Sequence, residues 1–301
     1  MVIVRLIGGL GSQMSEYAFA KALQNQGYKV KLDTSAFKYY RLHNYELSHY
    51  DIDLECSTDE ENEEYQNNSL VIKLLKKLLP IHIFIKLLHI TGINFYNSNV
   101  VEEKSLLFDS QFLKVNDGSY LIGDFKSEKY FKSVRDILLK QFIINRECSH
   151  YMQEMELKIS EASNSCFIHV RRGDFANDPK ANKVHGVCSV DYYNRAVSYM
   201  KTQVRDLHFF IFSNDIDWCQ KNLVIDNATY MNNQDRSLPH EDIHLMSLCN
   251  HSIIDHSAFC WWGSWLNQND EAIVVAPERW FSDDEFQKQS GDIYCKGWIK
   301  L

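Results

Sequence analysis

Two adjacent arginines and an aspartate follow a short apolar run, and their chemistry is the most readily interpreted in this chain. Residues 166–170 read Cys-Phe-Ile-His-Val, which predicts a buried strand. Arg171, Arg172 and Asp174 follow it. A guanidinium binds two oxygens of a diphosphate at once and keeps its charge where water is excluded. The pattern predicts a diphosphate site at a strand end, with surface ion pairs to Asp174 as the structural alternative.

Polar residues follow two further predicted strands. They are Ser213, Asn214 and Asp215 after residues 208–212, and Asp255, His256 and Ser257 after residues 252–254. In an open parallel sheet, ligands bind beyond the carboxyl ends of the strands, so these ends are expected to form one pocket with the arginines. The Asp215 carboxylate can accept hydrogen bonds from the two donors of a guanine edge. Ser257 can cap a helix and offer its hydroxyl to a phosphate.

A glycine-rich turn near the N-terminus is a weaker signal. Residues 8–13 read Gly-Gly-Leu-Gly-Ser-Gln between an apolar run and a helical pattern. Glycine there allows close backbone approach, and the start of a helix attracts anions. The run matches neither G-x-G-x-x-G nor a P-loop, so a structural turn is the competing interpretation.

Two metal-binding patterns compete with the diphosphate interpretation. His240, Glu241 and His244 form H-E-x-x-H, the spacing of a zinc hydrolase site. Pro239 places His240 at a helix start, and no standard third ligand follows. Asp215 and Asp217 form the D-x-D pattern of metal-dependent sugar transferases, but Asp51 and Asp53 show how readily this pattern arises. We expect no metal, because arginines already neutralise a diphosphate.

The elements that would position these residues alternate between strand and helix. The first half predicts strands over 1–7 and 28–33 with a helix over 12–26 between them. The second half predicts strands over 167–170, 208–212, 252–254 and 272–276, and helices over 190–203, 216–223, 242–250 and 259–267. A helix over 149–163 precedes the strand that bears the arginines. This order favours an α/β protein with parallel sheets and two domains.

Three other segments have less specific patterns. Residues 51–68 are acidic and polar, with five carboxylates over 58–64, and they predict a solvated loop. Residues 69–90 are apolar with lysines and a central Pro80, so they predict packed helices, with contact to the cytoplasmic leaflet through Lys73, Lys76 and Lys77 as the alternative. Residues 261–265 hold three tryptophans at helical spacing, which indicates core.

The overall composition limits the partners and the compartment. The net charge is -8, so the field of the whole protein attracts no polyanion, and nucleic acid is not an expected partner. The eight cysteines form no C-x-x-C pair, and the chain starts with a strand pattern rather than a signal peptide. We expect reduced thiols in a cytoplasmic protein, with peripheral contact to the inner membrane face as an additional hypothesis.

Taken together, the motifs resemble the bacterial α-1,2-fucosyltransferase family. The resemblance covers most of the chain and rests on the order of five segments, which are residues 8–14, 123–131, 169–174, 212–215, and 245–251 with 259–266. The tryptophan-rich segment narrows the assignment, because more distant fucosyltransferases share only the first glycine-rich turn and the H-x-R-R-x-D element. The chain departs from the family pattern at Ser12, where Asn is usual, and at Asp255, His256 and Ala258.

Membership implies a GT-B-like fold of two Rossmann-type lobes, with the donor site in the C-terminal lobe facing the cleft between them. It implies an acceptor-side lobe over residues 1–155, with a helical insertion near 69–90, and a GDP-fucose-binding lobe over residues 156–301. The implied reaction is metal-independent, inverting transfer of fucose from GDP-β-L-fucose to the 2-hydroxyl of a terminal galactose on an oligosaccharide or surface polysaccharide precursor. An α-1,3 linkage and a non-catalytic sugar-nucleotide or glycan-binding module are the alternatives.

The resemblance also assigns roles to residues. Departure of GDP places charge on the β-phosphate, which Arg171 and Arg172 would stabilise. Successive strand residues point to opposite faces, so Arg171 is expected to make the direct contact and Arg172 to organise Asp174 or the lobe interface. Asp174 completes the catalytic set but is a poor base if it pairs with an arginine. The implied donor-binding residues are Gly9, Gly11, Gln13, His169, Arg171, Asn214, Asp215, Ser257, Ala258 and Phe259.

Overall fold

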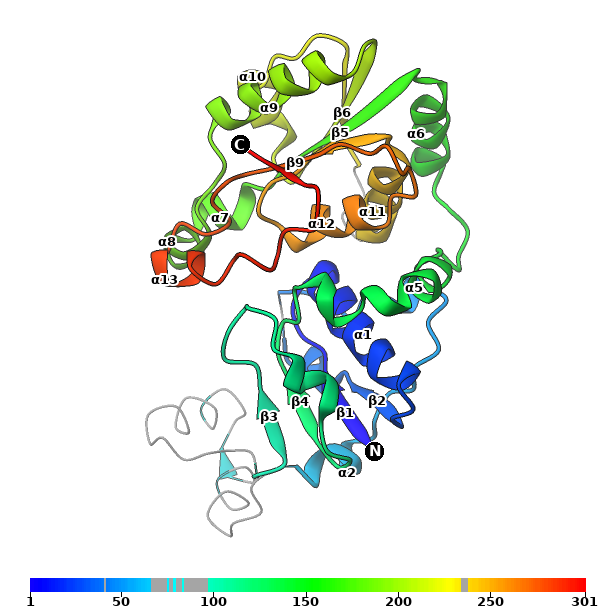
Figure 1. The fold of residues 1–301 in the computed structure, drawn as a ribbon, viewed down its shortest axis with the longest axis vertical. Coiled ribbons are helices and arrows are strands. Elements are labelled where there is room, and N and C mark those ends of the chain that lie inside the picture. Colours follow the sequence, from blue (N-terminus) through cyan, green and yellow to red (C-terminus); the bar gives the residue numbers. More distant parts are fainter. Residues whose placement is uncertain (41, 66–74, 76–77, 80–82, 84–96, 234–237) are drawn as a thin grey trace.

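The chain folds into two α/β lobes that lie along the long axis of the molecule (Figure 1). This computed structural model describes residues 1–40, 42–65, 75, 78–79, 83, 97–233 and 238–301. The expected helical insertion over 69–90, with its lysines, lies largely outside the described residues. Each lobe is built on a parallel sheet, so the prediction of a two-lobed α/β protein is confirmed.

The N-terminal lobe holds a four-stranded sheet in the order β2-β1-β4-β3, with every described pairing parallel. Residues 2–4 of β1 are fully buried, as expected for a central parallel strand covered on both faces. Gly8, at a φ of 92°, turns the chain from β1 into α1. The strands are β1 (Val2–Arg5), β2 (Val30–Asp33), β3 (Val100–Glu102) and β4 (Tyr120–Ile122), and the helices are α1 (Leu10–Asn25), α2 (Asp59–Glu63) and α5 (Arg135–Gln141).

The C-terminal lobe holds a six-stranded parallel sheet in the order β10-β9-β8-β5-β6-β7. The strands are β5 (Asn164–Val170), β6 (Leu207–Ser213), β7 (Ala228–Met231), β8 (His251–Ile253), β9 (Val274–Ala276) and β10 (Ile299–Lys300). The helices are α6 (His150–Glu161), α7 (Gly173–Asn177), α8 (Pro179–His185), α9 (Val190–Gln203), α10 (Ile216–Asn222), α11 (Pro239–Leu248), α12 (Ala258–Trp265) and α13 (Asp284–Gln287).

The chain crosses between the lobes in the stretch that joins α5 to α6 (Figure 1). The predicted boundary at 155/156 falls within α6, which packs on α11 of the C-terminal lobe. At the crossing, the backbone N–H of Ser149 donates to the Glu241 carboxylate at 2.8 Å. Glu241 is almost fully buried, so this contact ties the crossing segment to α11.

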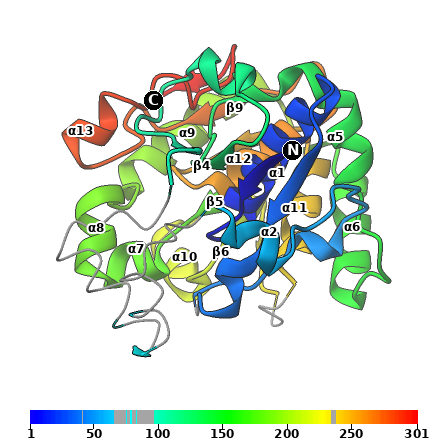
Figure 2. The same cartoon turned by 90° about the horizontal axis from the view of Figure 1, so that it is seen from below.

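The tryptophan-rich helix α12 joins the two lobes. Trp261, Trp262 and Trp265 are each less than 5% exposed, which confirms the prediction that they belong to the core. The Trp262 indole N–H donates to the Gly11 carbonyl at 2.9 Å and to the Ser15 hydroxyl at 3.1 Å, both on α1. Figure 2 shows α1 crossing in front of α12 when the molecule is viewed along its long axis. One apolar core therefore runs through both lobes.

The prediction of a solvated loop over residues 51–68 is wrong at residues 59–63. Residues 59–63 form helix α2, because Thr58 and Glu61 make a reciprocal capping box. The Thr58 hydroxyl accepts from the Glu61 N–H at 3.2 Å, and the Glu61 carboxylate accepts from the Thr58 N–H at 2.8 Å. Carboxylates in a first helical turn also interact favourably with its unpaired N–H groups. The acidic residues 59–61 therefore form the capped first turn of a helix.

Candidate functional site

A cavity of about 570 Å³ lies between the lobes, a volume typical of a small-molecule site. It is lined from both sides. We call its lining residues numbered below 130 the N-terminal wall and those numbered above 165 the C-terminal wall. The N-terminal wall consists of the start of α1, Lys126 and five loop residues, which are Tyr40, Leu42, His43, Asn44 and Glu46. The C-terminal wall consists of the carboxyl ends of β5 and β6, the starts of α11 and α12, and several aromatic residues.

Two helix N-termini open onto this cavity, those of α1 and α12. They touch backbone to backbone, because a Cβ on Gly11 would lie 2.6 Å from the Ala258 carbonyl carbon. Ser257 caps α12 by accepting a hydrogen bond from the Phe259 N–H at 3.2 Å. Unpaired N–H groups at helix starts give partial positive charge, so this junction suits an anionic ligand.

The two arginines after β5 have different surroundings. Arg171 lines the cavity, with its guanidinium carbon 5.4 Å from the centre of the Phe175 ring. Arg172 is not among the residues that line it. Its Nε lies 3.5 Å from an Asp215 carboxylate oxygen, and its guanidinium stacks 3.9 Å above the Trp218 ring. Only Arg171 of this pair is therefore placed to meet a ligand in the cavity.

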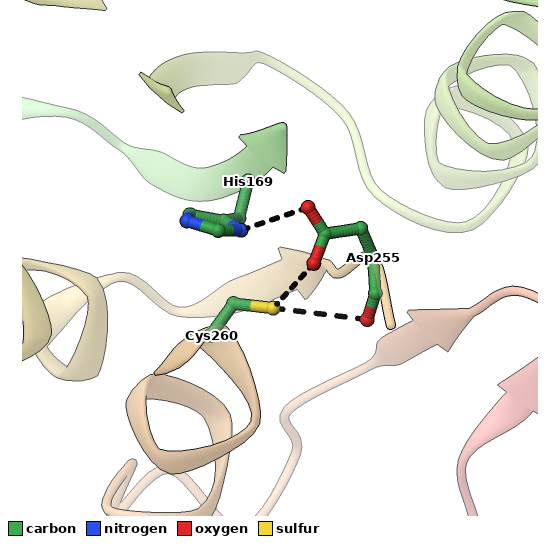
Figure 3. A group of neighbouring side chains, drawn as sticks. All are labelled: His169, Asp255 and Cys260. Carbon is green, nitrogen blue, oxygen red and sulfur yellow. Dashed lines mark hydrogen bonds and ion pairs between the residues drawn. The ribbon is translucent and has the colours of Figure 1, made fainter. Parts of the chain in front are cut away.

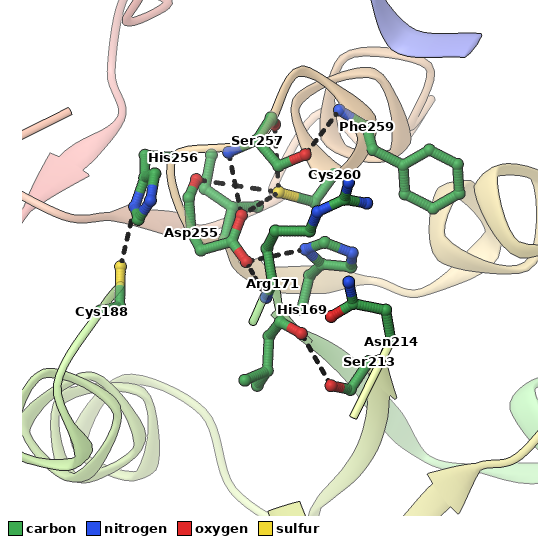
Figure 4. Close-up of polar contacts among 12 residues, drawn as sticks. His169, Arg171, Cys188, Ser213, Asn214, Asp255, His256, Ser257, Phe259 and Cys260 are labelled. Carbon is green, nitrogen blue, oxygen red and sulfur yellow. Dashed lines mark hydrogen bonds and ion pairs between the residues drawn. The ribbon is translucent and has the colours of Figure 1, made fainter. Parts of the chain in front are cut away.

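A buried carboxylate, Asp255, organises the C-terminal wall (Figure 4). Its oxygens accept hydrogen bonds from the Arg171 and Ser257 backbone N–H groups, the latter at 2.9 Å. His169 Nδ1 lies 3.0 Å from Asp255 Oδ2, and the Cys260 thiol donates to Oδ1 at 3.2 Å. One side chain thus connects the end of β5 to the start of α12.

The charge state of Asp255 follows from these contacts. Burial by itself raises the pKa of a carboxyl, but the attraction and hydrogen bond to His169, the proximity of His256 and the Arg171 N–H lower the pKa of Asp255 to about 2. Asp255 is therefore ionised at neutral pH. Its contact with His169 Nδ1 leaves Nε2 of this cavity-lining ring as the nitrogen available to a ligand.

His169, Asp255 and Cys260 lie close enough together to hold a metal ion (Figure 3). A metal would need the thiolate of Cys260, yet burial raises the pKa of this thiol well above its ordinary value. The protonated thiol is a hydrogen-bond donor, and both Asp255 oxygens already accept two donors each. The geometry fits a hydrogen-bonded hub better than a metal centre.

The other site residues predicted from the sequence fall into two groups. Some line the cavity, and others hold neighbouring parts of the structure in place. Gly9, Gly11, His169, Asn214, Ser257, Ala258 and Phe259 line the cavity together with Arg171. Gln13 and Asp215 are not among the lining residues. Asp215 caps α10 by accepting from the Trp218 N–H at 3.2 Å, and Gln13 is fully buried in the N-terminal lobe. The Asp174 side chain lies outside what the structure describes.

The zinc interpretation of His240, Glu241 and His244 is wrong, because the three side chains have separate partners. His240 stacks on His49 with ring centres 3.8 Å apart. Glu241 binds Ser149, and His244 lies 3.9 Å from Glu156. Helix α11 begins at Pro239, so its first turn forms part of the lobe interface instead of a metal face.

The structure adds residues that the sequence did not indicate. Asp242 lies within the H-E-x-x-H run and lines the C-terminal wall. The motif therefore pointed to a segment of the site, although the zinc chemistry that it suggested is wrong. Tyr40, His43 and Glu46 line the N-terminal wall from an irregular loop. A loop has no periodicity, so only the fold could reveal their position. None of the helices in the described part of the chain is both long and apolar enough to cross a bilayer.

Comparisons with known proteins agree with this architecture. The chain is 30% identical over 307 residues to the O-antigen biosynthesis glycosyltransferase WbnK of Escherichia coli, covering 98% of this chain and 99% of the relative. It is 29% identical over 313 residues to an Escherichia coli alpha-1,2-colitosyltransferase, covering 100% and 99%. The crystal structure of fucosyltransferase NodZ from Bradyrhizobium superposes with a TM-score of 0.50 at 11% identity, covering 87% of this chain and 92% of that chain.

These findings confirm the expected fold and family. The two parallel-sheet lobes with the cavity between them form a GT-B-like fold. The family model for glycosyl transferase family 11 matches residues 1–301. The chain is therefore an enzyme of the glycosyltransferase class, and it belongs to glycosyl transferase family 11.

Proposed function

We propose that this enzyme transfers L-fucose from GDP-β-L-fucose, with inversion, to the 2-hydroxyl of a terminal galactose. The observation that carries the proposal is the C-terminal wall, where Arg171 and the start of α12 meet at one place in the cavity. A guanidinium beside a set of backbone N–H groups suits a diphosphate. Both groups are held by Asp255, so they are oriented before the donor arrives.

Arg171 supplies the main electrostatic contribution in this proposal. Departure of GDP from the sugar leaves an added negative charge on the β-phosphate, and a fixed cation beside it lowers the barrier. The Ala258 N–H at the start of α12 adds partial positive charge. With the charge balanced in this way, we propose that the reaction needs no metal ion or other cofactor.

Asp242 takes the guanine-reading role that the sequence suggested for Asp215. A guanine edge offers two donors, N1–H and N2–H, to a carboxylate. Asp215 supports helix α10 and pairs with Arg172, whereas Asp242 lines the cavity, whose C-terminal wall also includes the apolar Phe212 and Leu238. A wall that offers both a carboxylate and apolar side chains suits a planar base with a polar edge.

The relatives support the linkage and the kind of acceptor. The name of one Escherichia coli relative gives an α-1,2 linkage, and the name of the other gives O-antigen biosynthesis. We therefore propose a galactose-terminated glycan of a surface polysaccharide as the acceptor. We also propose a cytoplasmic enzyme in which the lysines near residues 73–77 touch the membrane, which flotation with anionic vesicles would test.

The decisive experiment measures GDP release from GDP-fucose with a panel of galactosides, with and without EDTA, and determines the linkage of the product by NMR. We expect release that depends on the galactoside, survives EDTA and yields an α-1,2 product. Donor binding without turnover would indicate a binding module, and an α-1,3 product would correct the linkage. Faster turnover with GDP-colitose would make colitose the natural sugar.

A further inference from the structure

The N-terminal wall includes a carboxylate, on the opposite lobe from Arg171. Among the residues that the structure describes, Glu46 and Asp242 are the carboxylates that line the cavity. Asp242 belongs to α11 on the C-terminal wall, whereas Glu46 lies just before the short helix η2 (Leu47–His49). We propose that Glu46 is the general base that takes the proton from the acceptor hydroxyl. This inference rests on the proposed sugar transfer.

The position of Glu46 is fixed by Gln13 of α1. The side-chain oxygen of Gln13 accepts from the Glu46 N–H at 2.9 Å. Its side-chain nitrogen donates to the Asn44 carbonyl at 2.8 Å and to the Gly8 carbonyl at 2.9 Å. A fully buried amide thus attaches the loop to the glycine-rich turn before α1. The same helix start touches Ala258, so Glu46 is linked by short contacts to the proposed phosphate site.

The Glu46 carboxylate is oriented by an imidazole. His49 Nε2 lies 3.2 Å from Glu46 Oε2, and both side chains are less than 15% exposed. The His49 ring is held in turn by its stack on His240. A proton acceptor that faces a cavity and is oriented by a third group is the arrangement expected of a general base.

The stereochemistry of the proposed reaction favours a base on this side. Inversion needs the acceptor oxygen to approach the sugar C1 from the face opposite the leaving phosphate. With the diphosphate held by Arg171 and the start of α12, we place the hydroxyl on the side of the cavity where Glu46 lies. As the new C1–O bond forms, the bond from C1 to the β-phosphate oxygen breaks, and GDP leaves with that electron pair. The hydroxyl proton passes to Glu46, which later releases it to water.

His43 is the rival base on the same wall. It lines the cavity beside Gly9, where a Cβ would lie 3.4 Å from its Cε1. Neutral imidazole is a competent proton acceptor near pH 7. Glu46 is favoured because its backbone is held by Gln13 and its carboxylate by His49. Substituting each side chain on its own distinguishes the two candidate bases.

The test compares Glu46→Gln, His43→Gln and the control Glu55→Gln on an exposed loop. We expect Glu46→Gln to lower kcat for transfer by about 100-fold or more, the usual contribution of a general base. GDP binding, measured by calorimetry, should change by less than about threefold, because the base does not contact the nucleotide. Glutamine can still accept the His49 hydrogen bond, so Tm should stay close to that of the parent.

Two results would overturn the assignment. One is a Glu46→Gln enzyme that keeps more than about a tenth of the parent kcat. The other is a 100-fold loss in His43→Gln without a comparable loss in Glu46→Gln. If Glu46→Gln folds poorly, Glu46→Asp keeps the charge on a shorter arm, and its kcat must still fall by about tenfold or more for the proposal to stand. A parent enzyme without galactoside-dependent GDP release would instead contradict the proposed transfer.

Discussion

The two walls of the cavity are built in different ways. The C-terminal wall is organised around a buried anion, Asp255, whose contacts join a strand end to a helix start. The loop of the N-terminal wall is attached to α1 through the neutral amide of Gln13. A charged hub fixes groups that must match one diphosphate closely. A loop held by neutral hydrogen bonds can change sequence without disturbing that hub, as recognition of different acceptors would require.

The largest expected effect separates the two adjacent arginines. Arg171→Ala should lower kcat by about 10³-fold, because it removes the fixed cation beside the leaving phosphate. Arg172→Ala should mainly lower Tm, since Arg172 stacks on Trp218 and pairs with Asp215 away from the cavity. Steady-state kinetics and thermal unfolding of both variants check this. Equal kinetic losses in the two variants would mean that the arginines act as one unit.

The next effect tests the charged hub directly. Asp255→Asn keeps the shape of the side chain but removes its charge. The new amide N–H₂ group would face groups that are themselves hydrogen-bond donors. We expect the free energy of unfolding to fall by about 3 kcal/mol, as when one partner of a buried pair is lost. The KM for the donor should also rise, since the Arg171 and Ser257 backbones lose their shared acceptor. Asp226→Asn, at an exposed position, is the control and should change stability by less than about 0.5 kcal/mol. An unchanged donor KM would refute the positioning role.

A smaller effect is expected on the opposite wall. Gln13→Met keeps the size of the side chain but removes the hydrogen bonds that hold the 44–46 loop. We expect transfer to slow by about tenfold through misplacement of the loop. GDP affinity should be unchanged, and the free energy of unfolding should fall by about 2 kcal/mol. The exposed Gln26→Met is the matched control. A weakened GDP affinity in Gln13→Met would show that the two walls are not independent.

The smallest effect concerns pH and the contact between the lobes. Burial, followed by the nearby His49 and Arg146, lowers the pKa of His240 to about 4. The unfolded chain, with an ordinary histidine pKa near 6.5, then binds more protons between these pH values. This contribution to stability is complete above about pH 6.5 and is lost as the pH falls toward 4. Urea unfolding at pH 7 and 4.5 should show a smaller acid loss for His240→Gln, by about 2 kcal/mol, than for the parent or the exposed His150→Gln. Equal losses would place the acid sensitivity at other buried groups.

The sequence predicted the C-terminal wall better than the N-terminal wall, for a physical reason. Arg171 and Ser257 follow strands whose apolar runs are readable, and parallel strands bring their ends together. The hub at Asp255 was not foreseen, because His169 and the Arg171 N–H, which it joins to the start of α12, are more than 80 residues away along the chain. Asp215 and Gln13 have side chains suited to ligand binding, but the structure uses them for support. Asp215 caps a helix, and Gln13 holds a loop more than 30 residues away. Tyr40, His43 and Glu46 belong to a loop, which has no pattern to read.

The contact between Gly11 and Ala258 has a mechanical consequence. Two backbones in van der Waals contact cannot slide toward each other, and the Trp262 indole bridges the same junction. A widening of the cavity that kept both contacts would be a rotation about this point, as in a hinge whose pin is the pair of helix starts. Groups beside the pin move least, so the phosphate site keeps its geometry through such a rotation. Glu46 lies close to the same pin, because Gln13 attaches it to the turn before α1, so the proposed base and the phosphate site would keep their spacing while more distant parts of the lobes separate.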